Sequence, residues 1–226
     1  MSFDRAWLHP LFRDRRDAGR QLARSLGQYA GARNAIVLGL PRGGVPVAFE
    51  VARALSLPLD VYVVRKLSTP AHPELAMGAI GPGGVRVVQR AVVDELGVSG
   101  EALAAIEARE RAELERRESL YRRGRPPLDV ARKTVILVDD GLATGATMTA
   151  AVKALRAARP ARIVVTVPVS SPEACHDVAD HADEIVCART PADFMAVGLW
   201  YEEFEQTTDE EVRALLSSPP APRAPL

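Results

Sequence analysis

The feature that most constrains this sequence is an apolar run that ends in two adjacent acids and a loop of small residues. Residues 135–138 are Val-Ile-Leu-Val, Asp139 and Asp140 follow, and residues 141–147 read Gly-Leu-Ala-Thr-Gly-Ala-Thr. The apolar run favours a buried strand. An open α/β sheet leaves a ligand-binding crevice at the carboxyl ends of its strands. The segment therefore predicts an α/β fold with two carboxylates at one edge of its sheet.

Similar apolar runs alternate with helical patterns along most of the chain. Further strands are predicted at residues 35–40, 60–64, 163–169 and 184–187, and helices at residues 14–26, 45–55, 147–158, 172–179 and after Thr208. This alternation indicates a mostly parallel, twisted sheet of about five strands with helices on both faces. Residues 76–80 and 85–88 flank Gly81-Pro-Gly-Gly84 and predict two short strands joined by a tight reversal.

Residues 100–125 are rich in Ala, Glu and Arg, and they predict a solvent-facing helix. Acidic and basic side chains are spaced four residues apart in three pairs, Glu107 with Arg111, Glu113 with Arg117, and Glu118 with Arg122. We expect a core domain over residues 1–188, with a charged helical insert at about 81–125. A small C-terminal hood is expected at 189–216, and residues 217–226, with four prolines, are expected to be disordered.

Charge and composition exclude several classes of function. The 29 basic and 29 acidic residues give a net charge of zero, so no overall field attracts nucleic acid or an anionic membrane. No apolar run has the length of a membrane span, and the first residues lack a signal-peptide pattern. We expect a cytoplasmic protein. Cys175 and Cys187 are not in a CxxC motif and are interpreted as small buried hydrophobes, without a disulfide or zinc site.

The segment after the apolar run has a definite chemistry. Two adjacent carboxylates repel each other unless something compensates them, and a vicinal diol with a divalent cation would do so. Residues 143–147 bring backbone amides, two hydroxyls and a helix N-terminus around one point, which suits a phosphate monoester. The loop contains no lysine, so it is not a Walker A loop, and no GxGxxG motif follows a strand.

An apolar strand, Asp-Asp, two further residues and Ala-Thr-Gly-x-Thr together resemble the phosphoribosyl pyrophosphate (PRPP) signature of type I phosphoribosyltransferases. The resemblance implies that Asp139 and Asp140 hold the ribose hydroxyls and Mg²⁺, the latter largely through water. It also implies that a loop holds the 5′-phosphate, formed by Ala143, Thr144, Gly145, Ala146 and Thr147. The alternative is a strand end followed by a helix-capping threonine.

The resemblance extends to other loops. It implies a pyrophosphate site formed by Pro41, Arg42, Gly43, Gly44, Arg65, Lys66 and His72. It places a mobile flap at residues 67–75, within which Glu74 and His72 are the candidates for proton transfer or for contact with pyrophosphate. The implied catalytic residues are Asp139, Asp140, Lys66 and Glu74. The alternatives are an ordinary turn at residues 41–44, a solvated strand end at Arg65 and Lys66, and a surface loop with incidental polar residues at 67–75.

The acceptor of the phosphoribosyl group is less constrained. The family selects it with a variable hood, which implies contacts from Leu142, Phe194, Trp200 and Tyr201, although these aromatic rings would equally form the core of the hood. Ala143 stands where 6-oxopurine enzymes of the family carry an aspartate, which is more similar to the adenine type. The insert at about 81–125 is also longer than in common members of the family. The resemblance therefore does not define the homo-oligomeric interface or the substrate entrance.

Three classes of function compete. The first is a Mg²⁺-dependent transferase that moves 5-phosphoribosyl from PRPP to a nitrogen of a nucleobase-like small molecule and releases pyrophosphate. The second is a non-catalytic regulator that senses PRPP or a nucleotide, although the sequence has no basic helix-turn-helix. The third is an interaction module built on the charged helix.

Overall fold

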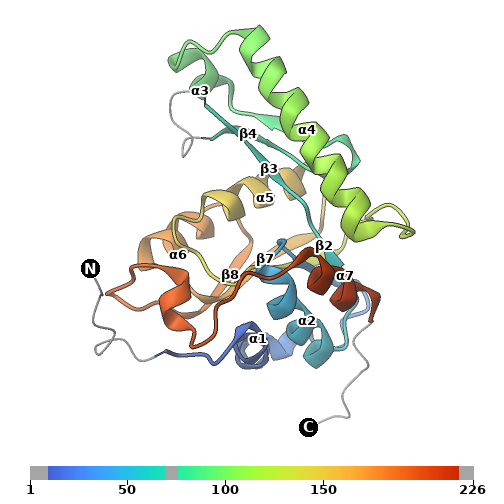
Figure 1. Cartoon of the computed structure of the whole chain (residues 1–226), viewed down its shortest axis with the longest axis vertical. Coiled ribbons are helices and arrows are strands. Elements are labelled where there is room, and N and C mark those ends of the chain that lie inside the picture. The colour runs from blue at the N-terminus through green and yellow to red at the C-terminus, as the bar shows by residue number, and fades with distance from the viewer. Residues whose placement is uncertain (1–9, 70–75, 219–226) are drawn as a thin grey trace.

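A parallel sheet of five strands forms the centre of the protein (Figure 1). The computed structural model describes residues 10–69 and 76–218. The strand order is β2-β1-β6-β7-β8, and all four neighbouring pairs are parallel. The strands are β1 (Ala35–Gly39), β2 (Leu59–Val61), β6 (Thr134–Val138), β7 (Arg162–Val169) and β8 (Glu184–Arg189). The predicted α/β fold with a five-stranded sheet is confirmed.

Helices cover both faces of this sheet, as predicted. Strand residues Val37, Ile136 and Val164 pack on the side of α1 (Arg15–Ala23), α2 (Gly44–Leu55) and α7 (Asp209–Ser217). Strand residues Leu38, Leu137 and Val165 pack on the opposite side against α5 (Ala146–Ala157) and α6 (Pro172–Ala179). This alternation follows from the two-residue period of a strand. In the described residues, no helix is both long and apolar enough to cross a membrane.

The register of the sheet aligns the ends of its two central strands. Gly39, the last residue of β1, lies opposite Val138, the last residue of β6, and the Leu40 amide donates to the Val138 carbonyl at 2.9 Å. The loops that follow these strands therefore leave the sheet side by side. In this way the fold brings residues 41–44 next to Asp139 and Asp140.

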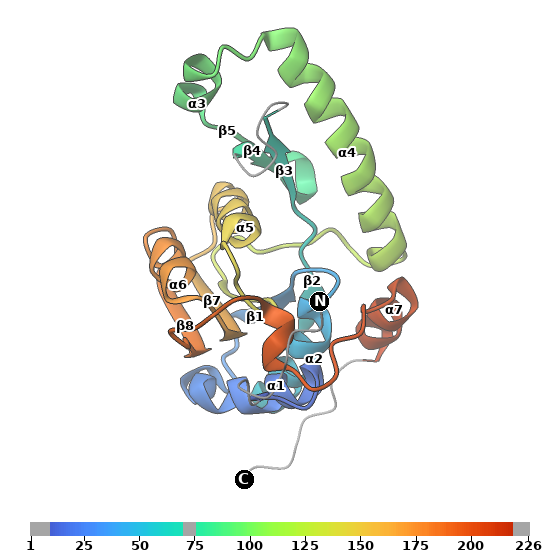
Figure 2. The same ribbon diagram turned by 60° about the vertical axis from the view of Figure 1, so that its left-hand side comes forward.

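An arm projects from the parallel sheet above α5 (Figure 2). It contains the antiparallel strands β3 (Arg65–Ser68), β4 (Ala76–Ile80) and β5 (Arg86–Val88), followed by α3 (Arg90–Glu95) and α4 (Gly100–Arg122). A short 3₁₀ turn, η3 (Pro82–Gly84), joins β4 to β5 and confirms the predicted reversal. All three strands contact α5, so the arm covers the helix that follows the acid pair.

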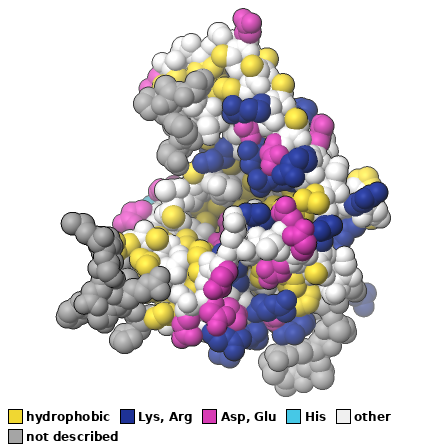
Figure 3. All heavy atoms as spheres, viewed as in Figure 1, with side chains coloured by type: hydrophobic (Ala, Val, Ile, Leu, Met, Phe, Trp, Pro, Cys, Tyr) yellow, Lys and Arg dark blue, Asp and Glu magenta, His cyan; other side chains and the backbone are white. Residues whose placement is uncertain are grey.

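The long helix α4 is less solvent-facing than predicted. Basic and acidic side chains lie interspersed on the face of the molecule that carries α4 (Figure 3). Of the three expected pairs, only Glu113 with Arg117 forms, at 2.6 Å. Glu107 binds Arg86, Arg122 binds Asp60, and the buried Glu110 binds Arg65. The Arg122–Asp60 and Arg65–Glu110 pairs are partly buried, whereas the Arg86–Glu107 pair is exposed and adds little stability.

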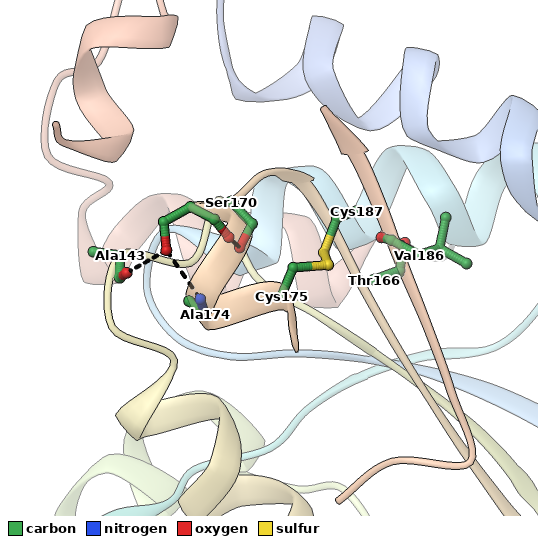
Figure 4. The surroundings of a disulfide bond; sticks show 8 residues. Ala143, Thr166, Ser170, Ala174, Cys175, Val186 and Cys187 are labelled. Atoms are coloured by element: carbon green, nitrogen blue, oxygen red, sulfur yellow. Dashed lines mark hydrogen bonds between the residues drawn. A yellow bond between two sulfur atoms is a disulfide. The ribbon is translucent and has the colours of Figure 1, made fainter. Parts of the chain in front are cut away.

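A disulfide joins Cys175 of α6 to Cys187 of β8, so the interpretation of both cysteines as unpaired buried residues is wrong (Figure 4). The Cα atoms are 6.6 Å apart, within the range of disulfides, and both side chains are only partly buried. The two residues approach because α6 packs back onto the edge strand β8. Neither the spacing of 12 residues nor the composition around either cysteine predicts this contact.

Reduction of this disulfide should destabilise the protein. Closing a loop of this length restricts the unfolded chain, so we expect the free energy of unfolding to fall by about 2 to 3 kcal/mol. Urea unfolding with and without dithiothreitol measures the change. The Cys175→Ser/Cys187→Ser variant is the control, because it should match the reduced wild type and should not respond to dithiothreitol. A wild type that is equally stable in both conditions would contradict the prediction.

The N-terminal segment of the described chain pairs with residues 200–202 of the region predicted as a hood. The Leu11 and Phe12 amides donate to the Trp200 carbonyl at 3.0 and 3.1 Å, and the Glu202 amide donates to the Phe12 carbonyl at 2.9 Å. The hood core contains Phe12, Ala18, Val169, Trp200 and Tyr201. Thus the hood depends on the N-terminal segment as well as on the predicted residues 189–216. The expected disordered tail of 217–226 begins one residue too early, because Ser217 is the last residue of α7, and residues 219–226 lie outside the described residues.

Candidate functional site

Asp139 and Asp140 lie at the carboxyl end of β6, where both residues are partly buried. The Asp140 side chain is 17% exposed. Burial, together with the charge of Asp140, raises the pKa of Asp139 well above its usual value. Burial also raises the pKa of Asp140, while the adjacent Arg15 acts to lower it. Asp139 forms no ion pair within the described residues, and its Oδ1 accepts only the Asp140 amide, at 2.9 Å. One of the two acids therefore lacks a positive partner.

The loop after β1 lies directly against these acids. A Cβ atom at Gly44 would be 2.6 Å from the Val138 carbonyl oxygen and 2.8 Å from the Asp139 Cα. A Cβ atom at Gly43 would overlap the Asp140 carboxylate. Glycine at both positions permits an approach that a side chain would prevent. The Pro41–Arg42 peptide bond in this loop is cis. The loop and the acid pair thus form one continuous surface.

The loop before α5 presents a helix N-terminus beside the acids. Ala143, Thr144 and Thr147 are exposed, and Gly145 has a φ of +69°, which a glycine adopts without strain. The loop rests on α6, because a Cβ atom at Gly145 would be 2.9 Å from the Val178 Cγ2. Free backbone amides at such a point attract an anion.

Ser171 ties this loop to α6. Its hydroxyl donates to the Ala143 carbonyl at 3.1 Å and accepts the Ala174 amide at 3.0 Å, which caps the first turn of α6. The disulfide holds the same helix against β8. The position of the loop before α5 is therefore fixed by a second helix as well as by its own strand.

The predicted cations point in different directions. Arg42 lies in the loop after β1, but its Nη1 is 3.7 Å from the Asp209 Oδ1 at the start of α7. The Arg65 Nε donates to the Glu110 Oε2 at 2.8 Å within the arm. Lys66 lies opposite Ala79 in the arm sheet and forms no ion pair within residues 10–69 and 76–218. His72 and Glu74 fall outside the described residues.

The predicted acceptor residues lie mostly inside the hood. Leu142, Trp200 and Tyr201 are buried, with exposed fractions of 3%, 6% and 4%. Phe194 is partly buried and its ring stacks against Trp200, with centroids 6.5 Å apart. The Tyr201 hydroxyl donates to the Asp140 carbonyl at 2.6 Å. These contacts favour the alternative in which the aromatic rings form the core of the hood.

Arg15 is the functional candidate that the sequence reasoning missed. Its Nε donates to the Asp140 Oδ2 at 2.8 Å, across a sequence separation of 125 residues. The only local signal at this position was the helix N-cap at Asp14, which indicates where α1 begins and nothing about Asp140. The contact arises because α1 packs on α2, whose N-terminus follows the loop beside the acids.

The donor set limits how a metal ion would be held. Within the described residues, no group of three or more His, Cys, Asp or Glu side chains has the arrangement of a metal site. The acid pair alone offers two carboxylates, of which that of Asp139 has no basic partner. Such a pair fits Mg²⁺ only if the substrate and water supply most of its oxygen ligands, which is the usual way this ion binds with phosphate compounds.

A cavity of about 190 Å³ extends from the loop before α5 to the underside of the arm. Thr144 and Ala146 line it at one end, and Gly78 and Val87 of the arm sheet cover it. Lys153 contributes a positive charge from α5. The arm therefore lies over the loop before α5. Residues 70–75 of the expected flap fall outside the described residues.

Comparison with known proteins matches this geometry to a family. The family model for the phosphoribosyl transferase domain matches residues 13–201. The structure of TT1426 from Thermus thermophilus superposes with a TM-score of 0.83 at 46% identity, covering 91% of this chain and 97% of that chain. Two curated proteins of Mycobacterium tuberculosis, Rv0571c and MT0597, carry the provisional name phosphoribosyl transferase and are 50% identical over 206 residues.

The chain spans about half the length of these curated relatives, since the match covers 91% of this chain and 46% of each of them. The family match itself includes the five-stranded sheet, the acid pair and the loops on either side of it. On this evidence the chain belongs to the phosphoribosyl transferase domain family, as the resemblance in its sequence predicted.

Proposed function

We propose that the protein is a PRPP-dependent phosphoribosyltransferase that transfers 5-phosphoribosyl to a nitrogen of a nucleobase-like small molecule and releases pyrophosphate. The observation that carries this proposal is the meeting of three segments at one edge of the sheet. The glycine loop after β1 contacts the acid pair after β6, and the loop of residues 141–145 leads directly from that pair to the helix N-terminus of α5. A sugar that carries a phosphate at each end needs this set of groups.

Each segment has a part in the proposed chemistry. The backbone amides of residues 145–147 bind the 5′-phosphate, and Asp139 and Asp140 accept hydrogen bonds from the ribose hydroxyls. Gly43 and Gly44 allow pyrophosphate to approach the backbone, and Arg42 and Lys66 provide cations for it. Asp139 and Asp140 would hold Mg²⁺ largely through water, and the ion would supply positive charge to the pyrophosphate oxygens.

The reaction is a displacement at C1′ of the ribose. The C1′–O bond to pyrophosphate breaks as the bond to the acceptor nitrogen forms, and the acceptor nitrogen loses its proton to water. Positive charge develops on the ribose ring in the transition state, as in glycoside cleavage. The carboxylates beneath the ring stabilise that charge, while Arg42 and Lys66 stabilise the negative charge on the departing pyrophosphate.

The acceptor is an open part of this proposal. Ala143 supports an acceptor that needs no carboxylate at this position, such as an adenine-like base. The burial of Trp200 and Tyr201 supports Phe194 as the aromatic side chain nearest to an acceptor. We propose that the acceptor binds beside Phe194 rather than between the three rings.

Release of pyrophosphate from PRPP tests the function directly. The full chain is incubated with PRPP, Mg²⁺ and each member of a panel of purine, pyrimidine and amine acceptors, and PRPP binding is measured in parallel by calorimetry. We expect acceptor-dependent release of pyrophosphate, with adenine-like bases preferred over 6-oxopurines. Binding of PRPP without turnover on any acceptor would favour the sensing regulator. Absence of both binding and turnover would overturn the proposal.

A further inference from the structure

Arg15, the first residue of α1, is held on three sides at the centre of the site. Its Nε donates to the Asp140 Oδ2 at 2.8 Å, and its Nη1 donates to the Glu205 carbonyl at 2.7 Å. The guanidinium carbon lies 3.9 Å from the centre of the Phe204 ring. The Arg15 side chain is 12% exposed. A guanidinium with a carboxylate, a carbonyl and an aromatic face as partners has one well-defined orientation.

The backbone of α1 is also fixed. The Asp14 Oδ1 accepts the Asp17 amide at 2.7 Å and caps the helix immediately before Arg15. Further along, α1 lies so close to α2 that a Cβ atom at Gly19 would be 2.6 Å from the Val47 carbonyl oxygen. Because α2 begins at the glycine loop, α1 and Arg15 keep a constant position relative to that loop and to the acid pair.

Asp140 is held both by its backbone carbonyl and by its side-chain carboxylate. Its carbonyl accepts the Tyr201 hydroxyl at 2.6 Å, and its Oδ2 accepts Arg15. Tyr201 packs against Phe204, with ring centroids 4.9 Å apart, and Phe204 lies beneath Arg15. The hood therefore contacts the backbone of Asp140 through Tyr201 and its carboxylate through Arg15. No side chain of the described residues binds the Asp140 Oδ1, so that oxygen remains available to a ligand.

We propose that Arg15 is a positioning residue for Asp140: it holds one carboxylate oxygen so that the other is directed at a ribose hydroxyl, and it couples this orientation to the hood. The inference rests on the proposed function, because it takes Asp140 as a ribose ligand. Arg15 acts through Asp140 and need not touch the substrate itself. A carboxylate fixed in this way binds the hydroxyl without losing rotational freedom at the moment of binding.

A double-mutant cycle on PRPP binding tests the coupling. Calorimetry with Mg²⁺ present measures PRPP affinity for the wild type, Arg15→Gln, Asp140→Asn and the double variant. We expect Arg15→Gln to weaken binding by about 10-fold to 100-fold, the loss typical when the hydrogen-bond partner of a metal-binding carboxylate or imidazole is removed. The double variant should bind no more weakly than Asp140→Asn alone, because Arg15 has no role once Asp140 is changed.

Three further variants separate orientation from charge and from folding. Arg16→Gln is the matched control, since Arg16 is the next residue of α1, is exposed and lies over Phe49, and its affinity for PRPP should equal the wild type. Arg15→Lys keeps the positive charge but lacks the planar fork, so it should recover only a small part of the affinity. Phe204→Leu removes no charge and should cause a smaller loss in the same direction. Thermal unfolding of every variant confirms that it is folded.

The outcomes distinguish this inference from the proposed function. If Asp140→Asn binds PRPP as tightly as the wild type, the assignment of the ribose site is wrong and both proposals fail. If Asp140→Asn loses affinity but the two losses multiply in the double variant, only the role of Arg15 is wrong. Unchanged or tighter binding by Arg15→Gln, or full recovery by Arg15→Lys, would also overturn the positioning role.

Discussion

The Asp139→Asn/Asp140→Asn variant should bind PRPP at least about 100-fold more weakly than the wild type. A hydrogen bond to a charged group contributes roughly 1.5 to 3 kcal/mol, and the proposed site uses one or more from each carboxylate. An amide also offers one acceptor oxygen where a carboxylate offers two, and its NH₂ group repels a hydroxyl donor. Calorimetric titration with PRPP and Mg²⁺ measures the loss.

The matched control for this variant is Asp129→Asn. Asp129 precedes the opposite end of the same strand, and its carboxylate is 68% exposed beside Lys133. This substitution should leave PRPP affinity unchanged. Unaltered binding by the double variant would show that the acids do not hold the ligand, and it would remove the basis of the proposed function.

Replacing Asp139 with asparagine should increase folding stability above pH 3.8, although it should weaken PRPP binding. Because the pKa of Asp139 is raised in the folded protein, the unfolded chain releases the Asp139 proton at lower pH than the folded chain does. Folding stability therefore falls as pH rises from the ordinary pKa of 3.8 to the raised value. The Asp139→Asn variant lacks this loss, so its free energy of unfolding relative to the wild type should increase with pH above 3.8. Urea unfolding at several pH values measures the difference, and a constant difference would contradict it.

The Gly44→Ala variant should lose both stability and PRPP binding. The added methyl would meet the Val138 carbonyl at 2.6 Å and the Asp139 Cα at 2.8 Å, and both are backbone atoms that cannot rotate away. The loop and α2 must then move away from β6. Overpacking of this kind costs about 1 to 3 kcal/mol of folding free energy. The movement also separates the proposed pyrophosphate and ribose sites, so we expect PRPP affinity to fall by more than about tenfold, which corresponds to about 1.4 kcal/mol.

Gly100→Ala is the comparison for this change. Gly100 begins α4, and a Cβ atom there would have no neighbour within 4 Å. Alanine should therefore leave PRPP binding intact and change stability by no more than about 1 kcal/mol, with stabilisation the expected direction. Urea unfolding and PRPP titration of both variants provide the test. Equal behaviour of Gly44→Ala and Gly100→Ala would contradict the close contact between the loop and the acid pair.

The sequence predicted those parts of the site that depend on a single strand and the loop after it. The apolar residues of β6 require burial, and the direction of the chain then brings Asp139 and Asp140 to the carboxyl end of the sheet. The turn at Gly145 and the start of α5 follow from residues within a few positions of one another. These signals are local, so neighbouring residues are sufficient to read them.

Contacts between distant segments could not be predicted in the same way. Arg65 was assigned to pyrophosphate from its place after an apolar run, but in the fold it binds Glu110 of α4. The disulfide between Cys175 and Cys187 depends on how α6 returns to β8. No periodicity or spacing encodes which cation meets which carboxylate, since many arginines of this chain have the same reach and charge.

The sequence by itself determined the α/β class, the strand that ends in twin acids, the small-residue turn before a helix and the family to which the chain belongs. Only the tertiary structure decided that Arg15 meets Asp140, that the N-terminal segment completes the hood and that Tyr201 is buried against the acid pair. The physical reason is the range of the interactions. Burial and turn preferences act between near neighbours, whereas the pairing of charges depends on helices whose packing is fixed only when the whole core has formed.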